Sequence, residues 1–156
     1  MTQQPFEHLS FDKPDEVRQG ENWRLDIVNL AGGAQVGRLT IQPGFRWTEH
    51  VKPVAGTELC MAPHQQYHVK GRIHIVMEDG SEAEMRPGEI ASIPPGHDAW
   101  VVGDEPAVTI DWVGASIWGA RCSPIHCFVL DVASETLCAW RTRTRRRLTS
   151  ICAHHI

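Results

Sequence analysis

The sequence predicts an all-β protein that folds as a single domain. Short runs of alternating apolar and polar residues recur up to residue 113, and Gly/Pro turn signals separate them every ~8 to 12 residues. Up to residue 115, no stretch repeats its apolar residues with the period of a helix. The chain has 156 residues, of which 42% are hydrophobic and 22% charged, which is ordinary for a globular domain. These observations favour a β-barrel or β-sandwich.

The predicted strands follow one another from residue 23. Before them, the polar segment 1–22 contains prolines and a glycine, and it predicts an irregular N-terminal arm. Strands are expected at residues 23–30, 35–42, 45–51, 72–78, 81–86, 89–93, 98–102 and 107–113, and residues 66–70 lead into a turn at Gly71. The Asp79-Gly80 pair is a strong hairpin signal between two of these strands.

The composition changes near residue 120. All 13 glycines lie at or before Gly119, whereas four of the five cysteines and an arginine-rich run at 141–147 come later. We therefore divide the chain into an arm (1–22), a β-barrel (23–119) and a basic Cys/Arg-rich tail of uncertain structure (120–156). The arginine run fits a solvated tail, a contact with phosphates or anionic lipid, or a segment without function.

Charge and cysteine content limit the partners and the location. Residues 1–120 hold 9 Lys/Arg and 17 Asp/Glu, and an acidic body argues against nucleic acid as its partner. No apolar run approaches the ~18 to 20 residues that a membrane span needs. The N-terminus lacks the pattern of a secretory signal, so we expect a cytoplasmic protein whose odd, unevenly placed cysteines are thiols.

A set of candidate metal ligands lies in the middle of the chain. Glu58, Cys60 and His64 are evenly spaced, so in an extended segment their side chains share one face. With His97 as the fourth candidate, the set offers one oxygen, one sulfur and two nitrogen donors. Thiolate with imidazole suits Zn²⁺ first, and Fe(II) is the second choice. Each residue also has a purely structural interpretation. Cys60 would be a buried apolar thiol, His64 a core histidine, Glu58 a strand-end carboxylate and His97 a turn residue.

Two stretches, 56–71 and 87–99, resemble the paired motifs of the cupin superfamily, whose fold is a jelly-roll β-barrel. The second motif is matched by Gly88, Pro94 and Gly96. In the first motif Gly71 matches the family's glycine. Counting back from Gly71 places His64 at the position of the family's Glu. Counting further back places Glu58 and Cys60 at the positions of its His-x-His pair. The family's second-motif His falls at Ala99, so His97 is the substitute ligand. The resemblance covers roughly residues 40–113 and is closest to small single-domain bacterial cupins.

The resemblance implies a small-molecule pocket without choosing an activity. Three functions stay open: a metal-binding sensor or carrier, a metal-dependent enzyme of dioxygenase, isomerase or decarboxylase type, and a metal-free structural or interaction domain. The residue types at the ligand positions differ from those of the family's usual oxygenases, and this difference favours the sensor or carrier. In the enzyme, His50, His68 or Asp98 would transfer protons. The resemblance also makes a homodimer reasonable.

Overall fold

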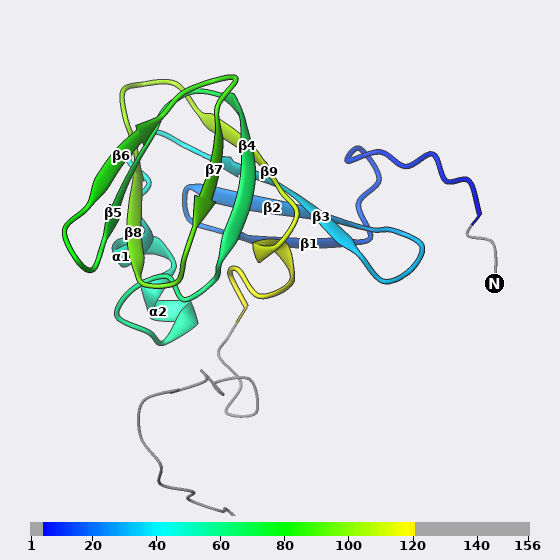
Figure 1. The fold of residues 1–156 in the computed structure, drawn as a ribbon, viewed down its shortest axis with the longest axis horizontal. Helices are drawn as coiled ribbons and strands as arrows, with labels where there is room; N and C mark the ends of the chain where they lie inside the picture. Colours follow the sequence, from blue (N-terminus) through cyan, green and yellow to red (C-terminus); the bar gives the residue numbers. More distant parts are fainter. Residues whose placement is uncertain (1–4, 121–156) are drawn as a thin grey trace, which may run out of the picture.

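The computed structural model describes residues 5–120, which form two antiparallel sheets (Figure 1). The larger sheet has the strand order β1-β2-β3-β9-β4-β7 and the smaller one β6-β5-β8. The strands are β1 (Glu16–Gly20), β2 (Trp23–Asn29), β3 (Gln35–Ile41), β4 (His64–Lys70), β5 (Ile73–Met77), β6 (Glu82–Met85), β7 (Ile90–Ile93), β8 (His97–Val101) and β9 (Ala107–Asp111). Two short helices, α1 (Trp47–His50) and α2 (Lys52–Ala55), lie between β3 and β4, and a 3-10 helix (Gly114–Ser116) follows β9. This is a cupin-type jelly roll, as predicted.

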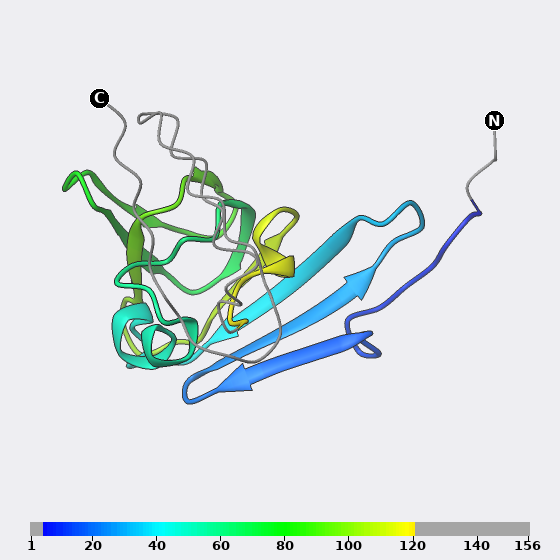
Figure 2. The same ribbon diagram turned by 90° about the horizontal axis from the view of Figure 1, so that it is seen from below.

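The core lies between the inward faces of the two sheets. Ile73 and Ile75 of β5 alternate with less buried residues, as a strand with one covered face requires. In β4 the inward positions are polar: His64, Gln66 and His68 are buried while their neighbours are exposed. The interior of this barrel therefore carries a polar wall on β4, and that wall positions the candidate site. Figure 2 shows β1, β2 and β3 extending beyond the barrel on one side.

A strand lies inside the segment predicted to be an irregular arm. β1 pairs with β2 from Glu16↔Ile27 to Gly20↔Trp23, across a tight turn in which Asn22 has φ 62°. β1 is an edge strand with no fully buried residue, so the alternating pattern that reveals the other strands is missing.

The strand predicted at 45–51 is wrong, because this segment contains α1. Trp47 and Val51, four residues apart, are both buried, which is the spacing of one helical face. The Asp98 carboxylate accepts hydrogen bonds from the Thr48 backbone N–H and hydroxyl, both at 3.1 Å, and fixes the first turn of the helix. Four residues are too few to establish a helical period in a sequence, so a strand and a short helix give similar patterns here.

Gly71 shows why the motif requires a glycine at this turn. Its φ is 69°, and a Cβ added there would lie 2.4 Å from the Pro106 carbonyl oxygen. Both the backbone conformation and the close approach to β9 exclude a side chain. The turn therefore allows β4 to lie against β9 and lead directly into β5.

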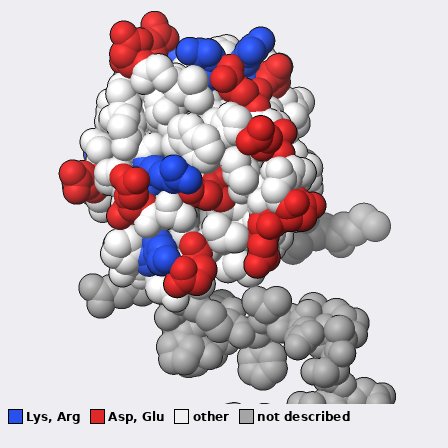
Figure 3. All heavy atoms as spheres, turned by 90° about the vertical axis from the view of Figure 1, so that its left-hand side faces the viewer, with Lys and Arg blue, Asp and Glu red and all other residues white. Residues whose placement is uncertain are grey.

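The surface on the β6 side mixes charges of both signs (Figure 3). Arg72 and Arg86 both pair with Glu84, at 3.3 Å and 3.2 Å. Within residues 5–120, no helix is long and apolar enough to cross a membrane. The predictions for the cysteines and arginines beyond residue 120 fall outside the described residues.

Candidate metal centre

Three of the four predicted ligands meet in the barrel interior. Cys60, His64 and His97 are all buried, and each offers a ligand atom within 4.8 Å of the other two. Cys60 Sγ lies 3.7 Å from His64 Nε2, and the rings of His64 and His97 are 5.2 Å apart between centroids. The three side chains thus form one compact group of a sulfur and two nitrogen donors.

The two sheets bring these residues together. His64 begins β4 in the larger sheet and His97 begins β8 in the smaller one. The segment before β4 reaches across to β8, where the Cys60 backbone N–H donates to the His97 carbonyl oxygen at 2.8 Å. The position of Cys60 is therefore fixed by its own backbone, independently of any metal.

Glu58 lies outside the group, contrary to the expectation from its spacing. Its side chain is 88% exposed and forms an ion pair with Lys52 of α2. Even spacing places side chains on one face only while the chain stays extended, and no strand covers residues 58–60. The plain reading of Glu58 as a solvated carboxylate fits this placement.

The hydrogen bonds of both histidines leave the same nitrogen free. His97 Nδ1 donates to the Pro94 carbonyl oxygen at 2.9 Å, and His64 Nδ1 donates to the Asp111 carboxylate. A proton on Nδ1 leaves the Nε2 lone pair of each ring available to a metal. His64 Nε2 is also the nitrogen next to Cys60 Sγ.

Asp111, at the end of β9, is a site residue that the sequence reasoning missed. Its carboxylate accepts backbone N–H groups of Val113 and Gly114 at 3.0 Å and 3.1 Å, besides the bond from His64. Burial raises the pKa of this carboxyl, but the hydrogen bonds and the charge of His64 hold it below its usual range. The sequence pattern that points to Asp111 is its alternation with Ala107 and Thr109, because all three are buried on the inward face of β9.

Gly114 completes the support of His64. A Cβ at this position would lie 2.4 Å from His64 Nδ1 and 2.6 Å from Asp111 Oδ2. Only a residue without a side chain leaves room for the His64–Asp111 pair. A carboxylate behind a histidine is the usual means of orienting a metal-binding imidazole.

Burial disfavours the charged forms of Cys60 and His97 in the absence of a cation. It raises the pKa of the Cys60 thiol to about 12, with further increases from the charges of Asp111 and Asp98. Burial, followed by the charge of His64, lowers the pKa of His97 to about 4. A neutral imidazole can bind metal directly, whereas the thiol must lose its proton when a cation arrives.

The three candidate proton-transfer residues lie elsewhere. His50 bonds Asn22 at 3.2 Å and stacks on Phe45, and Asp98 pairs with Arg46 at 2.7 Å besides capping α1. His68 is buried, with Nε2 bonded to the Gly71 carbonyl oxygen at 3.1 Å and Nδ1 without a partner among the described residues. None of the three lines the pocket beside the Cys/His/His group.

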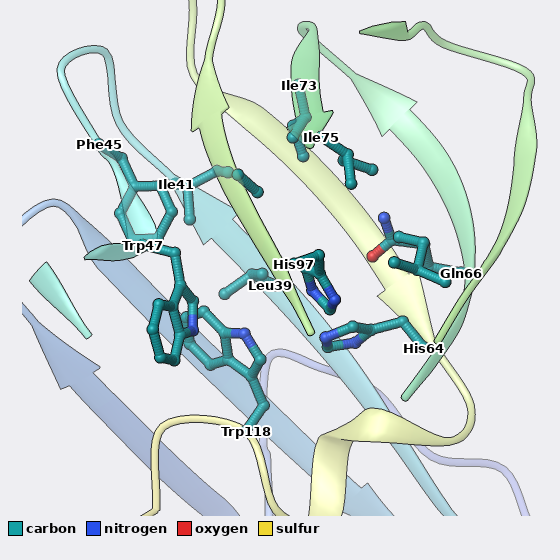
Figure 4. A pocket seen from close by; sticks show the side chains of 12 residues that line it. Leu39, Ile41, Phe45, Trp47, His64, Gln66, Ile73, Ile75, His97 and Trp118 are labelled. Carbon is teal, nitrogen blue, oxygen red and sulfur yellow. The ribbon is translucent and has the colours of Figure 1, made fainter. Parts of the chain in front are cut away.

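That pocket is a small cavity of about 30 Å³ between the sheets (Figure 4). Its polar lining consists of His64, His97 and Gln66 together with the indole groups of Trp47 and Trp118. The rest of the lining is apolar and comes from Leu39, Ile41, Phe45, Ile73, Ile75, Ile93 and Ala99. His64 and His97 therefore border a small space that is mostly apolar.

The donor set fits a tetrahedral ion such as Zn²⁺. Bond lengths of about 2.3 Å to sulfur and about 2.0 Å to nitrogen place neighbouring ligand atoms ~3.5 Å apart. The Cys60 Sγ to His64 Nε2 distance of 3.7 Å is close to that value. Three protein ligands leave one coordination position free, as in zinc sites that accept a further ligand.

Comparison with known proteins shows the fold alone. No family model and no curated protein matches the sequence. A protein of unknown function from Rhizobium leguminosarum is 19% identical over 70% of this chain and 96% of its own, with a TM-score of 0.52. The polyketide cyclase RemF from Streptomyces resistomycificus is 14% identical over 71% and 80%, with a TM-score of 0.51. A cupin-like protein from Thermotoga maritima is 15% identical over 66% and 80%, with a TM-score of 0.45.

The Rhizobium protein and RemF, both with TM-scores above 0.5, share the fold at identities too low to transfer an activity. The function must therefore be argued from the residues of this chain. The described part of the chain has the cupin-type jelly-roll fold, with a buried Cys60, His64 and His97 group suited to a metal ion.

Proposed function

We propose that this protein is a metal-binding cupin domain with a pocket for a small-molecule ligand, used as a sensor or carrier. The observation that carries the proposal is the convergence of Cys60, His64 and His97, with Nδ1 of both imidazoles engaged so that Nε2 stays free. Burial of the three donors and the carboxylate behind His64 are the features of a built metal site.

Zinc is the first choice of metal and Fe(II) the second. One thiolate and two imidazoles suit Zn²⁺, whereas non-haem Fe(II) sites usually combine histidines with a carboxylate. The only carboxylate predicted as a ligand, Glu58, points to solvent. When bound, the ion would supply Lewis acidity and a position for one further ligand.

A metal-dependent enzyme of dioxygenase, isomerase or decarboxylase type is the alternative. It needs a proton-transfer group next to the substrate. His50, His68 and Asp98 line other parts of the molecule and are engaged in structural hydrogen bonds. Their placement favours a binding function over an enzymatic one. If the centre takes up no metal, a metal-free interaction domain is the function to expect.

A cytoplasmic location and a small-molecule partner belong to this proposal. Cys60 is a free buried thiol, and a reducing compartment would keep it available as a ligand. The homodimer and the lack of a nucleic-acid partner stay predictions.

Elemental analysis after Zn²⁺ reconstitution and dialysis tests the proposal. We expect about one zinc per chain in the wild type and more than about 100-fold weaker zinc binding in Cys60→Ala, because losing a direct ligand costs more than losing a group that orients one. The matched control is Glu58→Gln, which changes the exposed carboxylate of the same segment and should retain full stoichiometry.

Two results would contradict the assignment. A wild-type protein that takes up neither Zn²⁺ nor Fe(II) would point to the interaction domain. Full metal content in Cys60→Ala, with circular dichroism showing an unchanged fold, would remove Cys60 from the site.

A further inference from the structure

We propose that Trp47 and Gln66 make the pocket beside the metal centre a binding site for small monoanions of about two to three non-hydrogen atoms. The inference rests on the proposed function, because it assigns the ligand class of the same site. It concerns two residues that are not metal ligands and that donate hydrogen bonds to whatever enters the pocket.

Trp47 supplies a hydrogen-bond donor that the protein itself does not use. Its side chain is 3% exposed, and its indole Nε1 has no hydrogen-bond partner among the described residues. A buried N–H group without a partner destabilises the folded state, so such groups are rare unless they have a role. The same indole lines the cavity that His64 and His97 border. The residue that carries the unpaired donor therefore lines the pocket in which a ligand would sit.

Gln66 supplies a second donor on another wall of the cavity. It follows His64 on the inward face of β4 and is 7% exposed. In Figure 4 its amide group points into the pocket, and the Trp47 indole stands across from it in this view, beyond His97. An amide NH₂ and an indole N–H both donate, so together they suit an occupant that accepts hydrogen bonds.

Charge favours an anion at this position. Two neutral imidazoles and one thiolate leave a divalent ion with one positive charge uncompensated among its direct ligands. The nearest carboxylate on the His64 side, Asp111, is already engaged by His64 and by backbone N–H groups. Asp98 is likewise paired with Arg46 and Thr48. A monoanion would neutralise the remaining charge in a pocket whose lining is largely apolar.

Cavity size limits the anion to a few atoms. The volume is about 30 Å³, and one water needs ~10 to 15 Å³ by this measure. Two or three water-sized groups therefore fit, which matches azide or formate. Buried side chains such as Phe45 and Trp118 line this small volume.

Azide binding to the Co²⁺-substituted, full-length protein tests the inference. Cobalt replaces zinc with a visible spectrum, so azide can be titrated by absorbance without any assay of activity. We expect a saturable spectral change in the wild type, and affinity weakened about tenfold or more in Trp47→Phe and in Gln66→Met, because each loses one hydrogen bond to a charged ligand. Benzoate, which is larger than the cavity, should produce no change.

Trp23→Phe is the matched control. Trp23 is 5% exposed and its Nε1 is also without a partner among the described residues, yet it does not line the cavity. This variant should bind azide like the wild type. Equal azide affinity in Trp47→Phe, Gln66→Met and wild type, with normal cobalt content, would overturn the inference and leave the metal site standing. Absence of bound cobalt in the wild type would overturn the metal site itself.

Discussion

At the scale of single residues, His64 is held from two sides. The Asp111 carboxylate accepts a hydrogen bond from the His64 Nδ1–H, and Gly114 leaves the space that this pair occupies. Neither residue touches the position of a metal, yet both determine which nitrogen faces Cys60. The chemistry of the centre therefore depends on a carboxylate that lies 47 positions along the chain from the histidine it orients.

Asp111→Asn should weaken zinc binding about 10- to 100-fold, because a neutral amide no longer stabilises the Nδ1–H form of His64 as a carboxylate does. Competition with a chromophoric chelator measures the affinity. Asp26→Asn is the control, since Asp26 is equally buried but pairs with Arg24 and Arg38. If Asp111→Asn binds zinc with wild-type affinity, Asp111 does not orient His64.

At the scale of elements, α1 is tied to β8 by Asp98. The Asp98 carboxylate accepts hydrogen bonds from Arg46 at 2.7 Å and from the Thr48 backbone at 3.1 Å. α1 is too short to be stable by itself, and it carries Trp47 into the core. Two consecutive residues of β8 thus have different roles. His97 belongs to the candidate metal centre, and Asp98 holds α1, whose Trp47 lines the pocket.

Asp98→Ala should lower the free energy of unfolding by about 2 kcal/mol, since it leaves the Thr48 donors unpaired. The Arg46 contribution is small because that side chain is 45% exposed. Urea unfolding measures the change. Thr48→Val, which removes the hydroxyl and its bonds to Asp98 and Arg46 but keeps the backbone bond to Asp98, should cost less. An unchanged midpoint in Asp98→Ala would show that α1 is held by packing alone.

At the scale of the whole molecule, buried histidines tie stability to pH. Burial lowers the pKa of His68 below its usual value, and burial with the charge of His64 lowers that of His97 to about 4. Between the folded and unfolded pKa values, the unfolded chain binds more protons than the folded one. The stability that depends on His97 is therefore fully present above about pH 6.5 and is lost as pH falls toward about 4. The stability that depends on His68 is likewise lost as pH falls below about 6.5.

The metal-free protein should lose at most about 1.4 kcal/mol of stability per pH unit for each of these histidines in that window. Urea unfolding in the presence of a chelator, repeated across the window, gives the slope. His68→Gln should show a shallower slope, whereas His8→Gln, which alters an exposed histidine before β1, should not. Equal slopes in wild type and His68→Gln would contradict the argument.

The sequence by itself determined the all-β class, the strands with one buried face and the turn at Gly71, and it predicted the three donors that the fold brings together. These follow from local rules: alternation, turn chemistry and the spacing of motifs. β1 was not predicted, because an edge strand without buried residues lacks the alternation that identifies a strand. α1 was not predicted, because four residues are too few to show a helical period.

Only the tertiary structure decided which of the predicted donors converge. Glu58 and Cys60 look equivalent by spacing, but the chain is not a strand there, so one carboxylate turns to solvent while the thiol is held beside β8. Asp111 and Trp47 lie outside both motif stretches. Asp111 joins the site through the pairing of β4 with β9, and Trp47 joins it through α1, which Asp98 holds. The spacing of residues along the chain determines which way their side chains point only within one regular element. Whether side chains from different elements meet depends on how the sheets pack.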